Sequence, residues 1–175
     1  MIQYTDIEGL YVIDGFIFND LRGSLIKPYS ISFFQEFDKD LELNFKEIWF
    51  TKSHKNVIRG MHLQVGEFSC EKLVSVIQGK VLDIVLDIRK ESSTYGKVFE
   101  IELNDKNSKA IYIPKGCAHG YKVIEDNTMT LYMATEINVP KCDVGIRWNS
   151  FGYNWDIKNP IISDKDSNLP AFDTI

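Results

Sequence analysis

The sequence contains no apolar run near the ~18 residues that a membrane-spanning helix requires, so we expect no membrane span. Residues 1–6 lack a basic region followed by an apolar one, which argues against a secretory signal. Cysteine is scarce, and Cys70, Cys117 and Cys142 form neither a close pair nor a metal-ligand spacing. An odd number of thiols in an unsecreted chain is typical of a reducing compartment, so we expect a cytoplasmic protein.

The chain also has fewer basic than acidic residues, and it has few histidines. The chain has 20 Lys and Arg against 25 Asp and Glu, and its net charge of −5 gives no global basic surface for a nucleic acid partner. Its three histidines are His54, His62 and His119, and none lies one or four residues from another. Protein metal sites often use clustered histidines with a carboxylate, so we expect no metal here.

The remaining features favour one β-rich domain over residues 1–175. A chain of 175 residues with 44% hydrophobic content can bury a sizeable core. Several short strands between turn signals predict a sandwich or barrel, and residues 31–37 predict one short helix. We expect the core at about 45–135, with the irregular segment of about 140–175 packed on it through its tryptophans and tyrosine.

Two strand predictions are specific enough to be tested. Residues 81–88 are mostly apolar or β-branched, which is typical of a strand buried on both faces. Residues 119–124 and 128–135 are expected to form a hairpin across the polar turn at 125–127.

The stretch at 56–64 carries the clearest chemistry. Gly60 permits an irregular backbone, and beyond it His62 and Gln64 alternate with apolar residues, so both should point away from the core. Arg59 is adjacent and Lys72 follows shortly. A neutral imidazole beside fixed cations suits a general base acting on an anionic substrate. The alternative is a strand histidine held in a hydrogen-bonded network.

These residues also carry a family resemblance. Arg59-Gly-Met-His-Leu-Gln64 resembles the RG-(L/M)-H-x-Q motif of the dTDP-4-dehydrorhamnose 3,5-epimerase family. The similarity continues in order through nearly the whole chain, at residues 18–23, 72–74, 78–96, 113–120, 131–132, 145–149 and 162–166. It implies an all-β, double-stranded β-helix jelly roll of the cupin type, with short peripheral helices. It also implies a homodimer in which the amino-terminal strands help to complete the neighbour's site.

The resemblance implies a role for each of several side chains. His62 matches the family's base, Asp166 the carboxylate that orients it, and Tyr132 the acid. A phenol with a pKa near 10 can donate a proton without being ionised at rest. Lys72 and Arg59 match groups that hold the enolate oxygen and the diphosphate.

The remaining matched positions concern support and substrate binding. His119 matches a position near the site, where it would support the site or contact the substrate. Asp83 is expected to support the site without contacting the substrate. The substrate-binding positions that the resemblance implies, beyond Arg59 and His119, are Arg22, Gln64, Glu47, Trp49 and Asn138. Of these, Glu47 and Trp49 replace amides that in the family meet the nucleotide base, and Asn138 stands in a segment where the family often has tyrosines. The nucleotide therefore stays open between dTDP, CDP and GDP.

The function implied is an epimerase of a nucleotide-linked 4-keto-6-deoxy sugar, acting at C3, C5 or both, in deoxysugar or surface polysaccharide biosynthesis. Proton removal beside a ketone and return to the opposite face needs no redox cofactor and no metal. Two alternatives stand beside it: a nucleotide-sugar 3,4-ketoisomerase, and a non-catalytic sugar-binding jelly-roll module.

Overall fold

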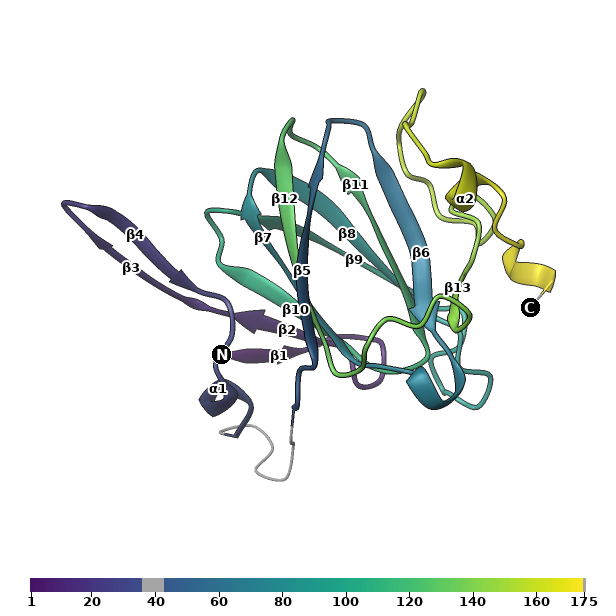
Figure 1. The fold of residues 1–175 in the computed structure, drawn as a ribbon, viewed down its shortest axis with the longest axis horizontal. Helices are drawn as coiled ribbons and strands as arrows, with labels where there is room; N and C mark the ends of the chain where they lie inside the picture. Colours follow the sequence, from purple (N-terminus) through teal and green to yellow (C-terminus); the bar gives the residue numbers. More distant parts are fainter. Residues whose placement is uncertain (36–42, 175) are drawn as a thin grey trace.

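Two antiparallel β-sheets lie face to face in the computed structural model, which describes residues 1–35 and 43–174 (Figure 1). The first sheet has the order β1 (Ile2–Tyr4), β2 (Tyr11–Asp14), β10 (Lys109–Ile113), β7 (Lys72–Gln78), β12 (Thr128–Ala134) and β5 (Glu47–Ser53). The second has the order β13 (Asp143–Gly145), β6 (Ile58–Gln64), β11 (Cys117–Val123), β8 (Lys80–Asp87) and β9 (Val98–Asn104). A separate hairpin of β3 (Phe16–Asp20) and β4 (Gly23–Lys27) projects away from both sheets.

The chain from β5 onward passes back and forth between the two sheets. Strands β5, β7, β10 and β12 belong to the first sheet, while β6, β8, β9, β11 and β13 belong to the second. This alternation makes the fold a double-stranded β-helix jelly roll, as expected.

The predicted hairpin of residues 119–124 and 128–135 is wrong, because the two strands lie in different sheets. Strand β11 pairs with β6 and β8, whereas β12 pairs with β5 and β7, so these two consecutive strands lie in different sheets. Each strand has an apolar inner face that must be buried against the opposite sheet, and the short turn between them crosses from one layer to the other. Period-two alternation identifies such strands but does not say which strand each one pairs with.

The inner faces of the two sheets enclose the main core. Strand β8 is buried along nearly its whole length, as predicted, because β9 and β11 flank it and the carboxy-terminal segment covers its outer face. In that segment the Trp155 indole donates to the Trp148 carbonyl at 2.7 Å, and Trp155 is 3% exposed. The tryptophans and Tyr153 thus pack residues 148–155 against the second sheet.

The helices are short and peripheral. Helix α1 (Ile31–Gln35) buries Phe34 and confirms most of the predicted helix, whose last two residues lie outside the described part of the chain. Helix α2 (Asp164–Ser167) begins at Ser163, whose hydroxyl accepts from the Asp166 amide, and it lies beside β6. Two 3₁₀ turns span Gly66–Phe68 and Phe172–Thr174. Within the described residues, the structure has no helix both long and apolar enough to cross a membrane.

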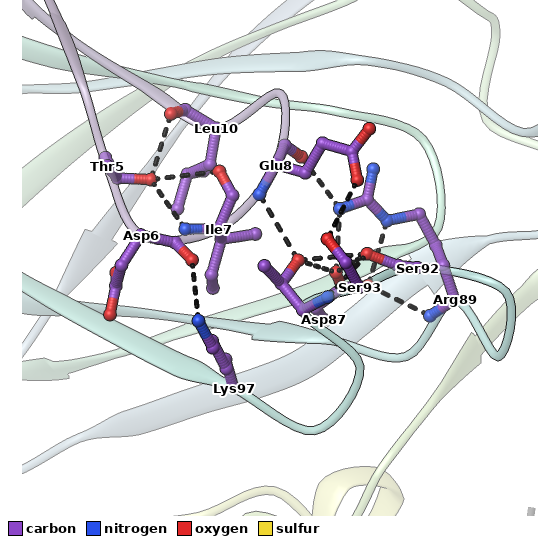
Figure 2. A network of polar contacts seen from close by, with 11 residues as sticks. Thr5, Asp6, Ile7, Glu8, Leu10, Asp87, Arg89, Ser92, Ser93 and Lys97 are labelled. Atoms are coloured by element: carbon purple, nitrogen blue, oxygen red, sulfur yellow. Dashed lines mark hydrogen bonds and ion pairs between the residues drawn. The ribbon is translucent and has the colours of Figure 1, made fainter.

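A buried carboxylate ties the amino-terminal segment to the body of the fold (Figure 2). Asp87 accepts hydrogen bonds from Arg89 at 2.7 and 2.8 Å, from Ser92 at 2.7 Å and from Thr94 at 2.6 Å. Arg89 also donates to the Glu8 carbonyl at 2.7 Å. Burial would raise the pKa of Asp87, but the hydrogen bonds from Arg89, Thr94 and Ser92 outweigh it and hold that pKa well below its usual range.

Candidate active site

A cavity of about 340 Å³ opens between the two sheets. Its walls come from β5, β6, β7, β11, β12 and β13, and from the segment around α2. Strand β6 contributes both Arg59 and His62, although their positions differ in parity, because the pairing of β6 with β11 shifts register between these two residues. The predicted site residues that line the cavity are Trp49, Arg59, His62, Lys72, His119, Tyr132, Asn138 and Asp166.

Three predicted residues lie elsewhere. Arg22 sits at the exposed turn of the β3–β4 hairpin, paired with Asp20 at 2.5 Å, so it is not part of its own chain's cavity. Gln64 is buried, and its amide donates to the carbonyls of residues 68 and 137 and accepts from the amide of residue 139. Gln64 therefore holds in place the loop that contains Asn138. Its side-chain amide is hydrogen-bonded to backbone groups. Glu47 lines an adjoining cavity of about 570 Å³ that shares Trp49 and Asn138 with the first.

The structure brings His62 and Asp166 together from positions 104 residues apart. His62 Nε2 lies 2.9 Å from Asp166 Oδ1, and the Gly60 amide donates to Asp166 Oδ2 at 3.0 Å. Burial opposes ionisation of Asp166, but hydrogen bonds from His62 and Gly60 lower the pKa of that carboxyl below its ordinary value. An ionised carboxylate accepts, so Nε2 carries the hydrogen in the neutral ring. Nδ1 is buried, has no hydrogen-bond partner among the described residues and keeps its lone pair.

Asp143 is a site residue that the sequence analysis missed. Its carboxylate lies 3.9 Å from His62 Nδ1 and forms an ion pair with Lys165 at 2.5 Å. Strand β13 places it there by pairing with β6, so that Gly145 lies opposite His62. The three residues of β13 are too few to show a periodicity. The available signal was Lys165, which lies in the same motif as Asp166.

Lys72 contributes its side-chain amino group to the cavity wall. Burial lowers the pKa of its ammonium group, and the nearby Cys70 and Asp143 oppose that shift. Lys72 forms no ion pair with any residue that the structure describes. Arg59 uses its Nε to donate to Ser53 at 3.0 Å, which fixes the guanidinium at the cavity. Cations held in this way favour an anionic ligand.

His119 and Asp83 form a buried pair beneath the cavity. His119 Nε2 lies 2.8 Å from Asp83 Oδ2, and the two side chains are 4% and 0% exposed. Burial raises the pKa of Asp83, and the contact with His119 opposes that shift. The His119 ring lies edge-on to the Tyr132 ring at 5.9 Å. The pair therefore lies against the cavity wall next to Tyr132.

Tyr132 is held by a stacked aromatic partner. It lies opposite Trp49 in the β12–β5 register, and the two rings stack at 5.0 Å with planes 3° apart. Burial raises the pKa of Tyr132 well above 10, the neighbouring Tyr121 hydroxyl adds to the effect, and Arg59 opposes it. The phenol is therefore protonated at neutral pH. The described residues contain no cluster of three or more His, Cys, Asp or Glu side chains arranged to hold a metal ion.

Comparison with known proteins gives a consistent result. The family model described as dTDP-4-dehydrorhamnose 3,5-epimerase matches residues 4–174. The chain is 35% identical over 169 residues to the dTDP-4-dehydrorhamnose 3,5-epimerase of Methanothermobacter thermautotrophicus, covering 94% of this chain and 90% of that one. The Escherichia coli enzyme of the same name is 33% identical over 174 residues, covering 98% and 94%.

Solved structures agree with the sequence relatives. The dTDP-4-dehydrorhamnose 3,5-epimerase of Elizabethkingia anophelis is 32% identical with a TM-score of 0.91, covering 99% of this chain and 97% of that one. The Legionella pneumophila dTDP-6-deoxy-D-glucose-3,5-epimerase, solved in complex with dTDP-4-keto-L-rhamnose, is 29% identical with a TM-score of 0.92, covering 100% and 94%. A family model spanning almost the whole chain, close relatives and a shared fold lead to one conclusion: this chain belongs to the dTDP-4-dehydrorhamnose 3,5-epimerase family.

Proposed function

We propose that this protein is an isomerase that inverts C3, C5 or both in a nucleotide-linked 4-keto-6-deoxy sugar. The observation that carries the proposal is the convergence of His62–Asp166 and Tyr132 on one cavity whose wall also holds the ammonium group of Lys72. A base, an acid and a cation around one substrate-sized space are the groups that enolate chemistry requires.

The reaction moves protons only. His62 Nδ1 takes the proton from the carbon beside the ketone, and the C–H electrons form the enolate. Lys72 stabilises the negative oxygen, and Asp166 stabilises the imidazolium through its contact with Nε2. Tyr132 then gives its phenolic proton to the opposite face of the carbon, which inverts the centre. No electron is gained or lost, so these steps need no redox cofactor.

The adjoining cavity is the proposed position of the nucleotide. Arg59 lies at the main cavity and suits the diphosphate, while Glu47, Trp49 and Asn138 line the space next to it. The relative from Legionella pneumophila was solved with a dTDP-sugar, which supports a nucleotide sugar as substrate. The Glu47 carboxylate accepts hydrogen bonds but cannot donate, unlike an amide, so CDP- and GDP-sugars belong in the test beside dTDP-sugars.

A homodimer would bring Arg22 to a site. The β3–β4 hairpin exposes Phe16, Phe18 and Leu25, and the outer face of edge strand β5 exposes Ile48 (65%) and Phe50 (60%). Exposed apolar groups at a sheet edge and on a projecting hairpin favour association with a second copy. In this arrangement Arg22 of one protomer approaches the cavity of its partner.

Complementation tests the shared site directly. Arg22→Ala and His62→Asn proteins are each expected to be nearly inactive. Mixed and allowed to exchange subunits, they form heterodimers in which one site has both native residues, so activity returns. If the mixture stays as inactive as its components, or the active parent is monomeric by light scattering, the shared site is refuted.

The activity itself is tested in deuterated water with dTDP-, CDP- and GDP-4-keto-6-deoxy sugars. NMR reports which carbon gains deuterium, and product analysis reports which centre is inverted. A product with its carbonyl moved to C3 would identify a ketoisomerase, and binding without exchange would identify a sugar-binding module. Cys70 and Cys117 are free and buried, which supports our proposal that the protein works in the cytoplasm, in deoxysugar or surface polysaccharide biosynthesis.

A further inference from the structure

A chain of hydroxyl groups lies next to Tyr132 and has no role in the mechanism above. Tyr121, on β11, is 0% exposed, and its hydroxyl lies 2.8 Å from Thr51 Oγ1 on β5. Thr51 lines the cavity. Tyr132 lies on the same face of the sheet as Thr51, and its hydroxyl is close enough to that of Tyr121 for Tyr121 to raise the pKa of Tyr132. Thr51 and Tyr121 are therefore joined by a hydrogen bond, and together they connect the cavity wall to the neighbourhood of the proposed acid.

Packing alone does not account for the hydroxyl of Tyr121. The ring lies in the apolar cluster between the sheets, among residues that include Val74, Val85 and Val123. A phenylalanine would fill the same space and bring no polar atom that has to be satisfied. A buried hydroxyl costs free energy unless it is hydrogen-bonded, so the hydrogen bond with Thr51 is what makes this position tolerable for tyrosine.

The proposed mechanism creates a need for such a path. Each inversion leaves Tyr132 as a phenolate and His62 as an imidazolium, and both must be reset before the next inversion. Tyr132 is only 8% exposed, with Trp49 stacked on its ring, and a bound sugar would cover the rest. If two centres are inverted in one binding event, the reset must occur while the sugar is still in place.

We propose that Tyr121 and Thr51 form a relay that returns a proton to Tyr132 after each inversion, an inference that rests on the proposed role of Tyr132 as the acid. The Tyr121 proton passes to the phenolate oxygen of Tyr132, and the Thr51 proton passes to the oxygen of Tyr121. Thr51 takes a proton from water in the cavity, and the hydroxide left behind takes the proton held by His62. Every hydroxyl is restored, both catalytic residues are neutral again, and no charge is created.

The relay predicts a difference between the first turnover and later ones. Tyr132 starts protonated, so a Tyr121→Phe enzyme should complete its first inversion at close to the parent rate. Its steady-state turnover should fall at least about tenfold, because removing an acid–base group typically costs 10²–10⁴-fold and slow direct exchange with solvent remains. Rapid-quench measurements should therefore show a burst of one product per site followed by a slow phase.

Variants of the neighbouring threonines separate the relay from packing. Thr51→Val should reproduce the burst, and Thr51→Ser, which keeps a hydroxyl, should restore parent kinetics. Thr130 is a matched control: it lies opposite Thr51 in the β12–β5 register, is fully buried, and its hydroxyl has no partner within the described chain. Thr130→Val should leave both phases unchanged, since that hydroxyl is outside the path.

The experiment uses whichever of the dTDP-, CDP- and GDP-4-keto-6-deoxy sugars gives the fastest turnover with the parent protein. The relay is refuted if the first turnover and the steady state fall by the same factor in Tyr121→Phe, or if neither falls. If Tyr121→Phe does not fold, the same criteria apply to Thr51→Val. Failure of the underlying function gives a different result, because Tyr132→Phe would then invert the sugar at the parent rate.

Discussion

Replacing Asp166 by asparagine tests whether the carboxylate of Asp166 orients and stabilises His62 as the catalytic base. The carboxylate receives two N–H groups, one from His62 at 2.9 Å and one from Gly60 at 3.0 Å, each directed at a different oxygen. An asparagine presents one oxygen and one NH₂ to the same two donors. The Gly60 amide is fixed in the backbone, so we expect the oxygen to turn toward it and the NH₂ to face His62.

This change alters the chemistry of the imidazole. Facing an NH₂ donor, Nε2 must accept a hydrogen bond, so the ring proton moves to Nδ1 and removes the lone pair that takes the substrate proton. The imidazolium also loses its charged partner. A hydrogen bond to a charged group is worth about 1.5–3 kcal/mol. At about 1.4 kcal/mol per tenfold, that loss alone slows the reaction about 10- to 150-fold, and the tautomer change adds to it.

The assay is deuterium incorporation by NMR at saturating substrate, with nucleotide affinity measured by calorimetry. We expect Asp166→Asn to lose at least about tenfold in exchange rate while nucleotide affinity is retained. Asp164→Asn is the matched control, because Asp164 lies in the same turn of α2 with its side chain exposed. It should stay within about twofold of the parent, as surface substitutions usually do. If a folded Asp166→Asn protein incorporates deuterium at more than half the parent rate, the proposed role of Asp166 as the partner of the catalytic His62 is refuted.

Three further predictions follow from the same structure. His62→Asn should abolish exchange and leave nucleotide binding near normal, and a rate above roughly a tenth of the parent's would exclude His62 as the base. Tyr132→Phe should allow deuterium to enter with retention of configuration while inversion falls at least about tenfold, as judged by comparing exchange with product. Asp87→Asn should lower the free energy of unfolding at pH 7 by about 3 kcal/mol, because it removes one partner of the buried Asp87–Arg89 pair. Since the folded pKa of Asp87 is depressed, its stabilisation is full above the unfolded pKa near 4 and is lost as pH falls further. Denaturant titrations between pH 7 and 2 should therefore show a smaller acid-dependent loss in Asp87→Asn than in the parent.

Much of the candidate site could be predicted from the sequence because strand alternation is local. Strand parity correctly puts His62 on the face opposite Met61 and Leu63. The expected direction was wrong, because Met61 and Leu63 pack with the carboxy-terminal segment while His62 lines the cavity between the sheets. The contact with Asp166 required the family pattern, because nothing local relates residues 104 positions apart.

The incorrect predictions have one physical origin. Local periodicity identifies strands, but it does not determine which distant segments pair with each other. Gln64 has the same strand parity as His62, yet backbone groups of the loop beyond β12 use its amide. Asp143 reaches His62 only because β13 pairs with β6. The predicted hairpin at 119–135 failed because β11 and β12 belong to different sheets and do not pair with each other.

The alternation of strands between the two sheets has a consequence for how the protein becomes active. The cavity walls come from strands of both sheets, so no single hairpin or local segment contains a working site. Contacts between segments so far apart form only after large loops have closed, and such contacts appear late and slowly in folding. During refolding, catalytic activity should therefore return with the slowest global phase, well after most of the strand signal in circular dichroism has recovered.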